Sequence, residues 1–216
     1  MRHFQSKTSE SILVTQLRPL LEERGFEWVG AMHQFRKATE RGFVAVVLAI
    51  SPYESDAIIE FHLGIRIDAV ENLAYSYTNG LMGFRPNSMT LVTPLSRILD
   101  KRFQRFTVKN ELEVKQVAQI LLRQLEQRGF DFLSTYESLA TLDYLFNHAP
   151  NLPLNLVHQQ VNRALRGLAL AKLNQRNDLA LLIQQYRDLL AHHYATDMEK
   201  LKFDEFSQFL LNYSFN

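Results

Sequence analysis

The sequence predicts an α+β fold in which an N-terminal helix packs on an antiparallel sheet and a helical C-terminal half follows. Three observations support this fold class: apolar residues recur at helical spacing before Gly25, alternate with polar residues over 57–68, and return to helical spacing after Asn110. We therefore divide the chain into an α+β half, 1–109, and a helical half, 110–216, which form either two domains or one compact unit.

The first predicted helix runs from Ser11 to Arg24 and is followed by Gly25, at the position where a left-handed residue usually ends a helix. Pro19 lies inside this segment, which predicts either a kink or a helix whose regular part begins at Pro19. The apolar face of the helix consists of Ile12, Leu13, Leu17, Leu20 and Leu21.

Strands are expected over 26–29, 32–37 and 43–50, because these segments are rich in aromatic and β-branched residues and are separated by glycines. The clearest strand is 57–68, in which apolar and polar residues alternate. Such alternation predicts one face in the core and the other in water, as in an antiparallel sheet covered on one side. The apolar positions are Ile59, Phe61, Leu63, Ile65 and Ile67, and the polar ones are Glu60, His62, Gly64, Arg66 and Asp68.

Residues 68–95 fit two structures. The spacing of Val70, Leu73, Ala74 and Tyr77 predicts a short helix, whereas Asn79-Gly80 is typical of a hairpin turn. We favour the helix, followed by a strand over 89–93.

The helical half contains four periodic segments and an aromatic C-terminus. Capping-box patterns at Asn110 and Ser134 predict the first two helix starts, and Gly129 predicts the end of the first helix. The predicted helices are 112–128, 139–146, 153–173 and 179–190. One segment, 21–29, is echoed at 125–133, which indicates either an internal duplication or, as we favour, two helix ends that carry glycine after the last turn.

Composition predicts a soluble cytoplasmic protein. Cysteine is absent, as expected in a reducing compartment, the first residues are polar, and the longest apolar run, 43–50, is too short to cross a bilayer. Lys and Arg total 24 against 23 Asp and Glu, so the whole molecule has no general attraction for nucleic acid or acidic lipid.

The chain lacks the motifs that carry known chemistry, so no cofactor and no metal are expected. The glycines form no phosphate-binding loop, no H-E-x-x-H occurs, and neither G-x-S-x-G nor S-x-x-K is present. Asp188 and His192 stand four apart and fit a pair of metal ligands, but we favour an acid–base pair near a helix end, where His193 also lies.

Four catalytic candidates share the polar face of the 57–68 strand: Glu60, His62, Arg66 and Asp68. A histidine beside a carboxylate can act as a general acid or base, because its pKa lies near neutral pH. The alternative is a solvated face whose charges pair with one another.

Two further surfaces are candidates for binding. The segment Arg97 to Lys109 combines excess positive charge with Phe103 and Phe106, as single-stranded nucleic acid sites do, or it forms a plain basic edge. At the chain end, aromatic residues recur at helical spacing and form either a core face or an interface with a partner or a second copy. These residues are Phe203, Phe206, Phe209 and Tyr213.

The segment 17–26, the strand with Phe35-Arg36 and the end of the next strand at 63–65 resemble a bacterial family catalogued only as a domain of unknown function. The stretch 121–142 is similar to the second half of that family. The resemblance covers about two thirds of the chain and implies a helix, Gly-Phe, strands and then helices, without catalytic residues. Some relatives of such folds look like immunity proteins, which bind toxins. The segment 163–193 also resembles a tetratricopeptide hairpin, although a single hairpin cannot build a solenoid.

These observations favour a non-enzymatic protein that binds a protein partner. An immunity-like role is one form of this function. The alternatives are a hydrolase or transferase with a site around His62, and binding of a polyanion through Arg97 to Lys109.

Overall fold

The computed structural model describes residues 6–53, 56–78, 80–100, 104–192 and 195–214. The chain forms two compact units, each built from two segments. Unit 1 consists of Met1–Ile65 and Val92–Ser134, and unit 2 of Arg66–Leu91 and Thr135–Asn216. The predicted fold class is confirmed, because an N-terminal helix, an antiparallel sheet and a helical C-terminal half follow one another. The division at residue 110 stays a prediction.

Helix α1 (Ser6–Glu23) opens unit 1 and contains Pro19, so its regular part does not begin at that proline. The helix ends as Gly25 predicts: this residue has φ of 81°, and the N–H groups of Gly25 and Phe26 donate to the carbonyls of Glu22 and Leu21, both at 2.9 Å. These two bonds satisfy carbonyls that the last turn leaves without helical partners.

The described residues form a six-stranded sheet with the order β1-β2-β3-β4-β5, in which β6 pairs antiparallel with β4 at 57–59. The strands are β1 (Glu27–Val29), β2 (Gln34–Thr39), β3 (Gly42–Tyr53), β4 (Asp56–Ile67), β5 (Leu91–Pro94) and β6 (Phe106–Val108). A short 3-10 helix, η1 (Gly30–Met32), connects β1 to β2. The sequence did not predict β6, which is too short to show a period.

The alternation along β4 places one face in the core, as predicted, because the five apolar residues from Ile59 to Ile67 are all buried. The prediction that the other face is wet is wrong at the end of the strand, where Arg66 is only 6% exposed. Arg85 and Ser88 accept hydrogen bonds from its guanidinium, which a strand pattern cannot reveal.

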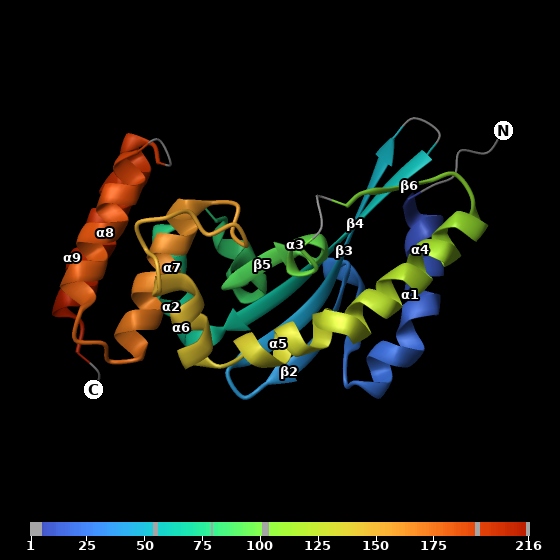
Figure 1. The fold of residues 1–216 in the computed structure, drawn as a ribbon, viewed down its shortest axis with the longest axis horizontal. Helices are drawn as coiled ribbons and strands as arrows, with labels where there is room; N and C mark the ends of the chain where they lie inside the picture. The colour runs from blue at the N-terminus through green and yellow to red at the C-terminus, as the bar shows by residue number, and fades with distance from the viewer. Residues whose placement is uncertain (1–5, 54–55, 79, 101–103, 193–194, 215–216) are drawn as a thin grey trace. The chain divides into compact units, whose positions relative to one another are not determined.

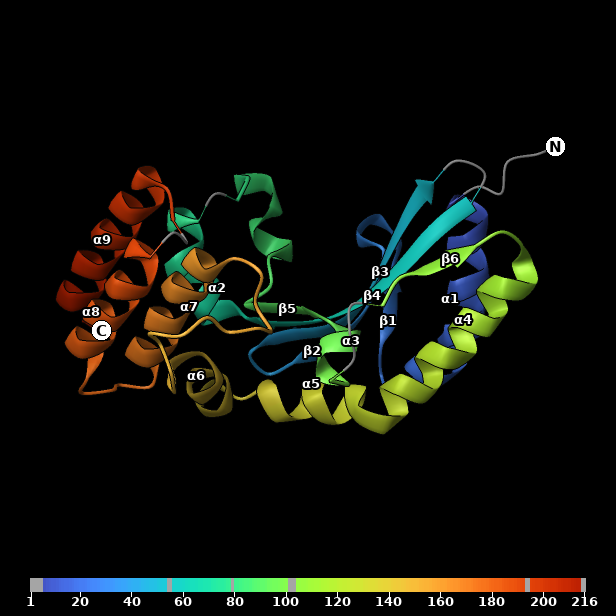
Figure 2. The same ribbon diagram turned by 45° about the horizontal axis from the view of Figure 1, so that its top comes forward.

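Helices cover the sheet of unit 1. Helix α1 packs on β1, on β3 and on α4 (Glu111–Gln124), and Figures 1 and 2 show α1 and α4 side by side. Asn110 caps α4 as predicted, since its side chain accepts a hydrogen bond from the Glu113 N–H. The other helices of this region are α3 (Leu95–Ile98), the π-helical turn η4 (Leu125–Gly129) and α5 (Phe130–Tyr136).

Unit 2 is built around α7 (Gln160–Leu173), which packs on α2 (Asp68–Ala74), α6 (Leu139–Asn147), α8 (Leu179–Ala191) and α9 (Asp197–Asn212). Figure 1 shows α8 and α9 together in orange and red. Two 3-10 helices, η2 (Tyr75–Tyr77) and η3 (Met82–Asn87), complete the unit. The helix favoured over a hairpin after Asp68 is confirmed.

Two predicted helix starts are wrong. Helix α7 begins at Gln160 instead of near Pro153, and Ser134 lies inside α5, so that Ser138 caps α6 by accepting a hydrogen bond from the Thr141 N–H. At α6 the chain has a second capping residue, Ser138, four positions after Ser134, whereas Gln159 before α7 makes no side-chain capping bond.

Candidate functional site

The polar side chains of β4 have separate surroundings. In unit 1, the Glu60 carboxylate forms an ion pair with Arg105. His62 is half-buried, and this burial lowers its pKa, an effect that the Glu60 charge opposes and the Arg97 charge reinforces. The imidazole is therefore neutral at neutral pH, the form that a general base requires.

Arg66 belongs to unit 2 and has a structural role. Its Nε donates to the Asp68 carboxylate at 2.5 Å, and its Nη1 donates to the carbonyls of Arg85 and Ser88, both at 2.8 Å. A buried guanidinium needs such acceptors, because an unpaired buried charge is strongly unfavourable. Arg66 thus holds the end of η3, while Asp68 is exposed at the start of α2.

The basic segment is partly paired with acidic residues. Arg105 contacts Glu60, and Lys109 Nζ lies 4.0 Å from the Asp56 carboxylate. Lys101, Arg102 and Phe103 lie outside the described residues, and the ring of Phe106 lies 6.1 Å from that of Phe61. Binding of a polyanion here stays a prediction.

The aromatic C-terminus divides into core and surface. Phe203 and Phe206 are buried in unit 2, and Phe206 packs on Tyr77 with ring centroids 4.8 Å apart. Phe209 is 37% exposed and lies 5.4 Å from the ring of Tyr213. An interface built from the predicted aromatic residues therefore has to use Phe209 and Tyr213.

Asp188 and His192 make separate hydrogen bonds. The Asp188 carboxylate accepts from the Gln184 side chain at 2.9 Å, and His192 Nδ1 lies 2.6 Å from the Asp188 backbone carbonyl. His193 lies outside the described residues, and among those described no group of three His, Asp or Glu side chains could hold a metal ion.

Sequence reasoning missed an exposed apolar surface in unit 2. Leu81, Met82 and Phe84, here called the apolar tip, are 71%, 63% and 55% exposed. The signal was available as three large apolar residues without helical or strand period after Asn79-Gly80, but the interpretation considered only the helix and the hairpin on either side of that dipeptide.

The backbone beneath the apolar tip is held from two sides. The Tyr75 hydroxyl donates to the Leu81 carbonyl at 2.5 Å, and Arg66 donates to the carbonyls of Arg85 and Ser88. Gly80 permits this arrangement, because a Cβ atom there would lie 2.5 Å from the Tyr75 hydroxyl. The apolar side chains thus project from a fixed backbone.

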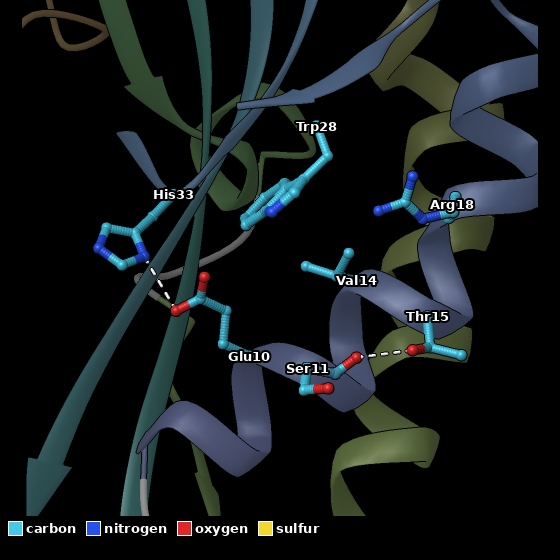
Figure 3. A pocket seen from close by; sticks show the side chains of 7 residues that line it. All are labelled: Glu10, Ser11, Val14, Thr15, Arg18, Trp28 and His33. Atoms are coloured by element: carbon cyan, nitrogen blue, oxygen red, sulfur yellow. Dashed lines mark hydrogen bonds and ion pairs between the residues drawn. The ribbon is translucent and has the colours of Figure 1, made fainter. Parts of the chain in front are cut away.

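A second feature that the sequence did not indicate is a pocket of about 560 Å³ in unit 1, here called the α1 pocket. Figure 3 shows α1 forming one side, with Trp28 of β1 and His33 after η1 opposite it. The His33 ring contacts the Glu10 carboxylate at 2.9 Å. The lining residues are Glu10, Ser11, Val14, Thr15, Arg18, Trp28 and His33.

Comparisons of the chain with models of protein families, with curated proteins and with solved structures found no match. Among the described helices, none is long and apolar enough to cross a membrane.

Proposed function

We propose that the protein is a non-enzymatic binding protein that recognises a protein partner through the apolar tip. The observation that supports this proposal most is the exposure of Leu81, Met82 and Phe84 on a backbone that Arg66 and Tyr75 hold in place. Large apolar side chains gathered on a surface are typical of interaction sites.

The fixed backbone favours binding for a physical reason. A loop that is ordered before binding loses less conformational entropy when the partner arrives, so more of the apolar contact energy becomes affinity. Met82 and Phe84 belong to the residue types enriched at interface cores, and Met adapts its shape to a partner surface. The proposed partner presents an apolar groove that receives these side chains.

The test uses two triple variants, each of which replaces one leucine, one methionine and one aromatic residue. Leu81→Ser, Met82→Ser and Phe84→Ser remove the apolar tip, and Leu181→Ser, Met198→Ser and Tyr144→Ser remove three exposed apolar residues elsewhere in unit 2. We expect the wild type and the control to retain a stoichiometric partner in affinity purification from the native host, and the tip variant to lose it. Equal recovery by both variants would exclude the apolar tip.

The chain resembles a domain-of-unknown-function family, and some relatives of such folds look like immunity proteins, so the first partner to test is a toxin encoded beside this gene. We propose a cytoplasmic location on the absence of cysteine. Direct mixing of the purified pair, followed by gel filtration, tests this form of the proposal. Co-elution that depends on the apolar tip supports it.

A second candidate function is acid–base chemistry at His62. One observation favours it: the imidazole is half-buried with a lowered pKa. Against it, Glu60 is engaged by Arg105 and Arg66 by Asp68, so the carboxylate and the cation of the expected cluster already have partners. Equal hydrolysis of a panel of generic ester and phosphoester substrates by the wild type and by His62→Gln would exclude this candidate.

A further inference from the structure

The α1 pocket has a carboxylate at one end and a guanidinium at the other. Glu10, Val14 and Arg18 are spaced by four residues and therefore line one face of α1. At 1.5 Å rise per residue, Glu10 and Arg18 are about 12 Å apart along the helix axis. Figure 3 shows Trp28 between these two residues, on the side opposite Val14.

Both charged ends keep capacity for further hydrogen bonds. The Glu10 contact with His33 uses Oε2, whereas an ionised carboxylate accepts about four hydrogen bonds. The Arg18 contact with Glu22 uses Nη1 at 2.6 Å, whereas a guanidinium carries five N–H donors. A ligand can therefore add bonds at each end without displacing these partners.

The middle of the pocket is apolar and fixed. Val14 is buried, and Trp28 packs against Phe35 with ring centroids 4.9 Å apart. Gly30 allows close packing, because a Cβ atom there would lie 3.2 Å from the indole nitrogen of Trp28. His33 adopts a left-handed backbone with φ of 50°, which is uncommon outside glycine and is often retained at binding sites.

We infer that the α1 pocket binds a short apolar peptide of three or four residues by its free termini. The ammonium group pairs with Glu10, the carboxylate pairs with Arg18, and the apolar body lies between Val14 and Trp28. An extended chain spans about 3.3–3.6 Å per residue, so three or four residues match the distance between the charged ends. The volume of about 560 Å³ lies within the range of small-ligand pockets, about 300–1,000 Å³.

Trp28 is the only tryptophan of the chain, so its fluorescence reports on the pocket directly. The probes are trileucine with free termini, its N-acetylated form, its C-amidated form and the doubly blocked peptide. We expect a saturable change with the free peptide, and about tenfold weaker binding or more with each blocked end, because each loses a charge-assisted hydrogen bond.

Two variants test which charged residue of the pocket binds which terminus of the peptide. Glu10→Gln should abolish the difference between free and N-acetylated peptide and keep the effect of C-amidation, and Arg18→Gln should do the reverse. Glu23→Gln and Arg41→Gln, both exposed and outside the pocket, should bind like the wild type, as should the apolar-tip variant. The inference is overturned if no peptide gives a saturable change in fluorescence at millimolar concentration. It is also overturned if the free and the blocked peptides bind equally well.

Discussion

Two buried threonines differ in whether their hydroxyl groups have partners. Thr93 is fully buried and its Oγ1 has no hydrogen-bond partner among the described residues, whereas the Thr90 Oγ1 accepts from the Ile67 N–H at 3.0 Å and bonds to Glu71. We therefore expect Thr93→Val to raise the free energy of unfolding by about 1 kcal/mol, because valine removes an unsatisfied buried polar group without changing the shape.

Thr90→Val is the matched control and should lower the free energy of unfolding by about 1–3 kcal/mol, because it leaves a buried N–H unpaired. Urea titrations of both variants and the wild type measure the two changes. A destabilised Thr93→Val variant would mean that its hydroxyl has a partner in solution, such as an ordered water.

Two glycines show how far a local pattern predicts structure. Gly25 and Gly129 stand in the similar segments 21–29 and 125–133, yet Gly25 has φ of 81° and ends α1, whereas Gly129 lies in η4 and the chain continues into α5. The interpretation as a helix end is thus right at Gly25 and wrong at Gly129. After Gly25 the chain forms β1, which pairs with β2. A pattern within 21–29 cannot show this partner strand.

At the scale of elements, Arg66 positions the backbone that carries the apolar tip. Arg66→Lys keeps the charge but loses the planar fork that bonds Asp68 and two carbonyls at once. We expect at least tenfold faster amide hydrogen exchange at Phe84 and Ser88, whose N–H groups donate to the Leu81 and Arg85 carbonyls.

The control for this measurement is the core of α7 and α8, where exchange should stay unchanged. Weaker partner binding by Arg66→Lys, with the tip residues intact, would identify Arg66 as a positioning residue. Unchanged exchange at Phe84 and Ser88 would show that other contacts, such as those of Tyr75 with Leu81 and of Arg85 with Asn72, hold the segment without the Arg66 fork.

Long elements with a clear period could be predicted, whereas the short ones could be predicted only in part: β1 and β5 were expected, but α3 and β6 were not. The strand β4 and the helices α4 and α8 follow their apolar patterns, whereas α3 and β6 have four and three residues and show no period. The α1 pocket could not be predicted, because Glu10 and Arg18 meet Trp28 only after β1 has joined the sheet. The apolar tip could not be predicted either, because the sequence does not show which apolar side chains, such as those of Leu81, Met82 and Phe84, stay exposed after folding.

At the scale of the whole molecule, each unit combines segments from both halves of the chain. In unit 1, α4 packs on α1, and in unit 2, α2 packs on α7 and supplies Glu71 to Arg166. We expect neither fragment 1–109 nor fragment 110–216 to fold alone, because each would expose an apolar face and the second would lack Glu71, the partner of Arg166. Circular dichroism during heating tests this, and a cooperative transition in either fragment would contradict it.

The pH dependence of stability should have two steps. Burial raises the pKa of Glu71, but the Arg166 charge and hydrogen bonds from Arg166, Ser88 and Thr90 lower it further, so the pKa lies below its ordinary value of 4.5. The folded state thus favours the carboxylate, and its contribution is lost as pH falls from about 4.5 toward the folded pKa. The lowered pKa of His62 also decreases the free energy of unfolding as pH falls below 6.5. The reason is that the imidazole takes up a proton at a higher pH in the unfolded chain than in the folded one.

Two variants separate these steps in urea titrations between about pH 3 and pH 8. His62→Gln should flatten the curve just below pH 6.5. Glu71→Gln should be less stable than the wild type at neutral pH, since it leaves Arg166 buried beside an uncharged partner, and the difference should shrink below pH 4.5. His158→Gln and Glu126→Gln, both exposed, should follow the wild type. If Glu71→Gln keeps its deficit at low pH, the loss comes from packing and not from the charge of Glu71.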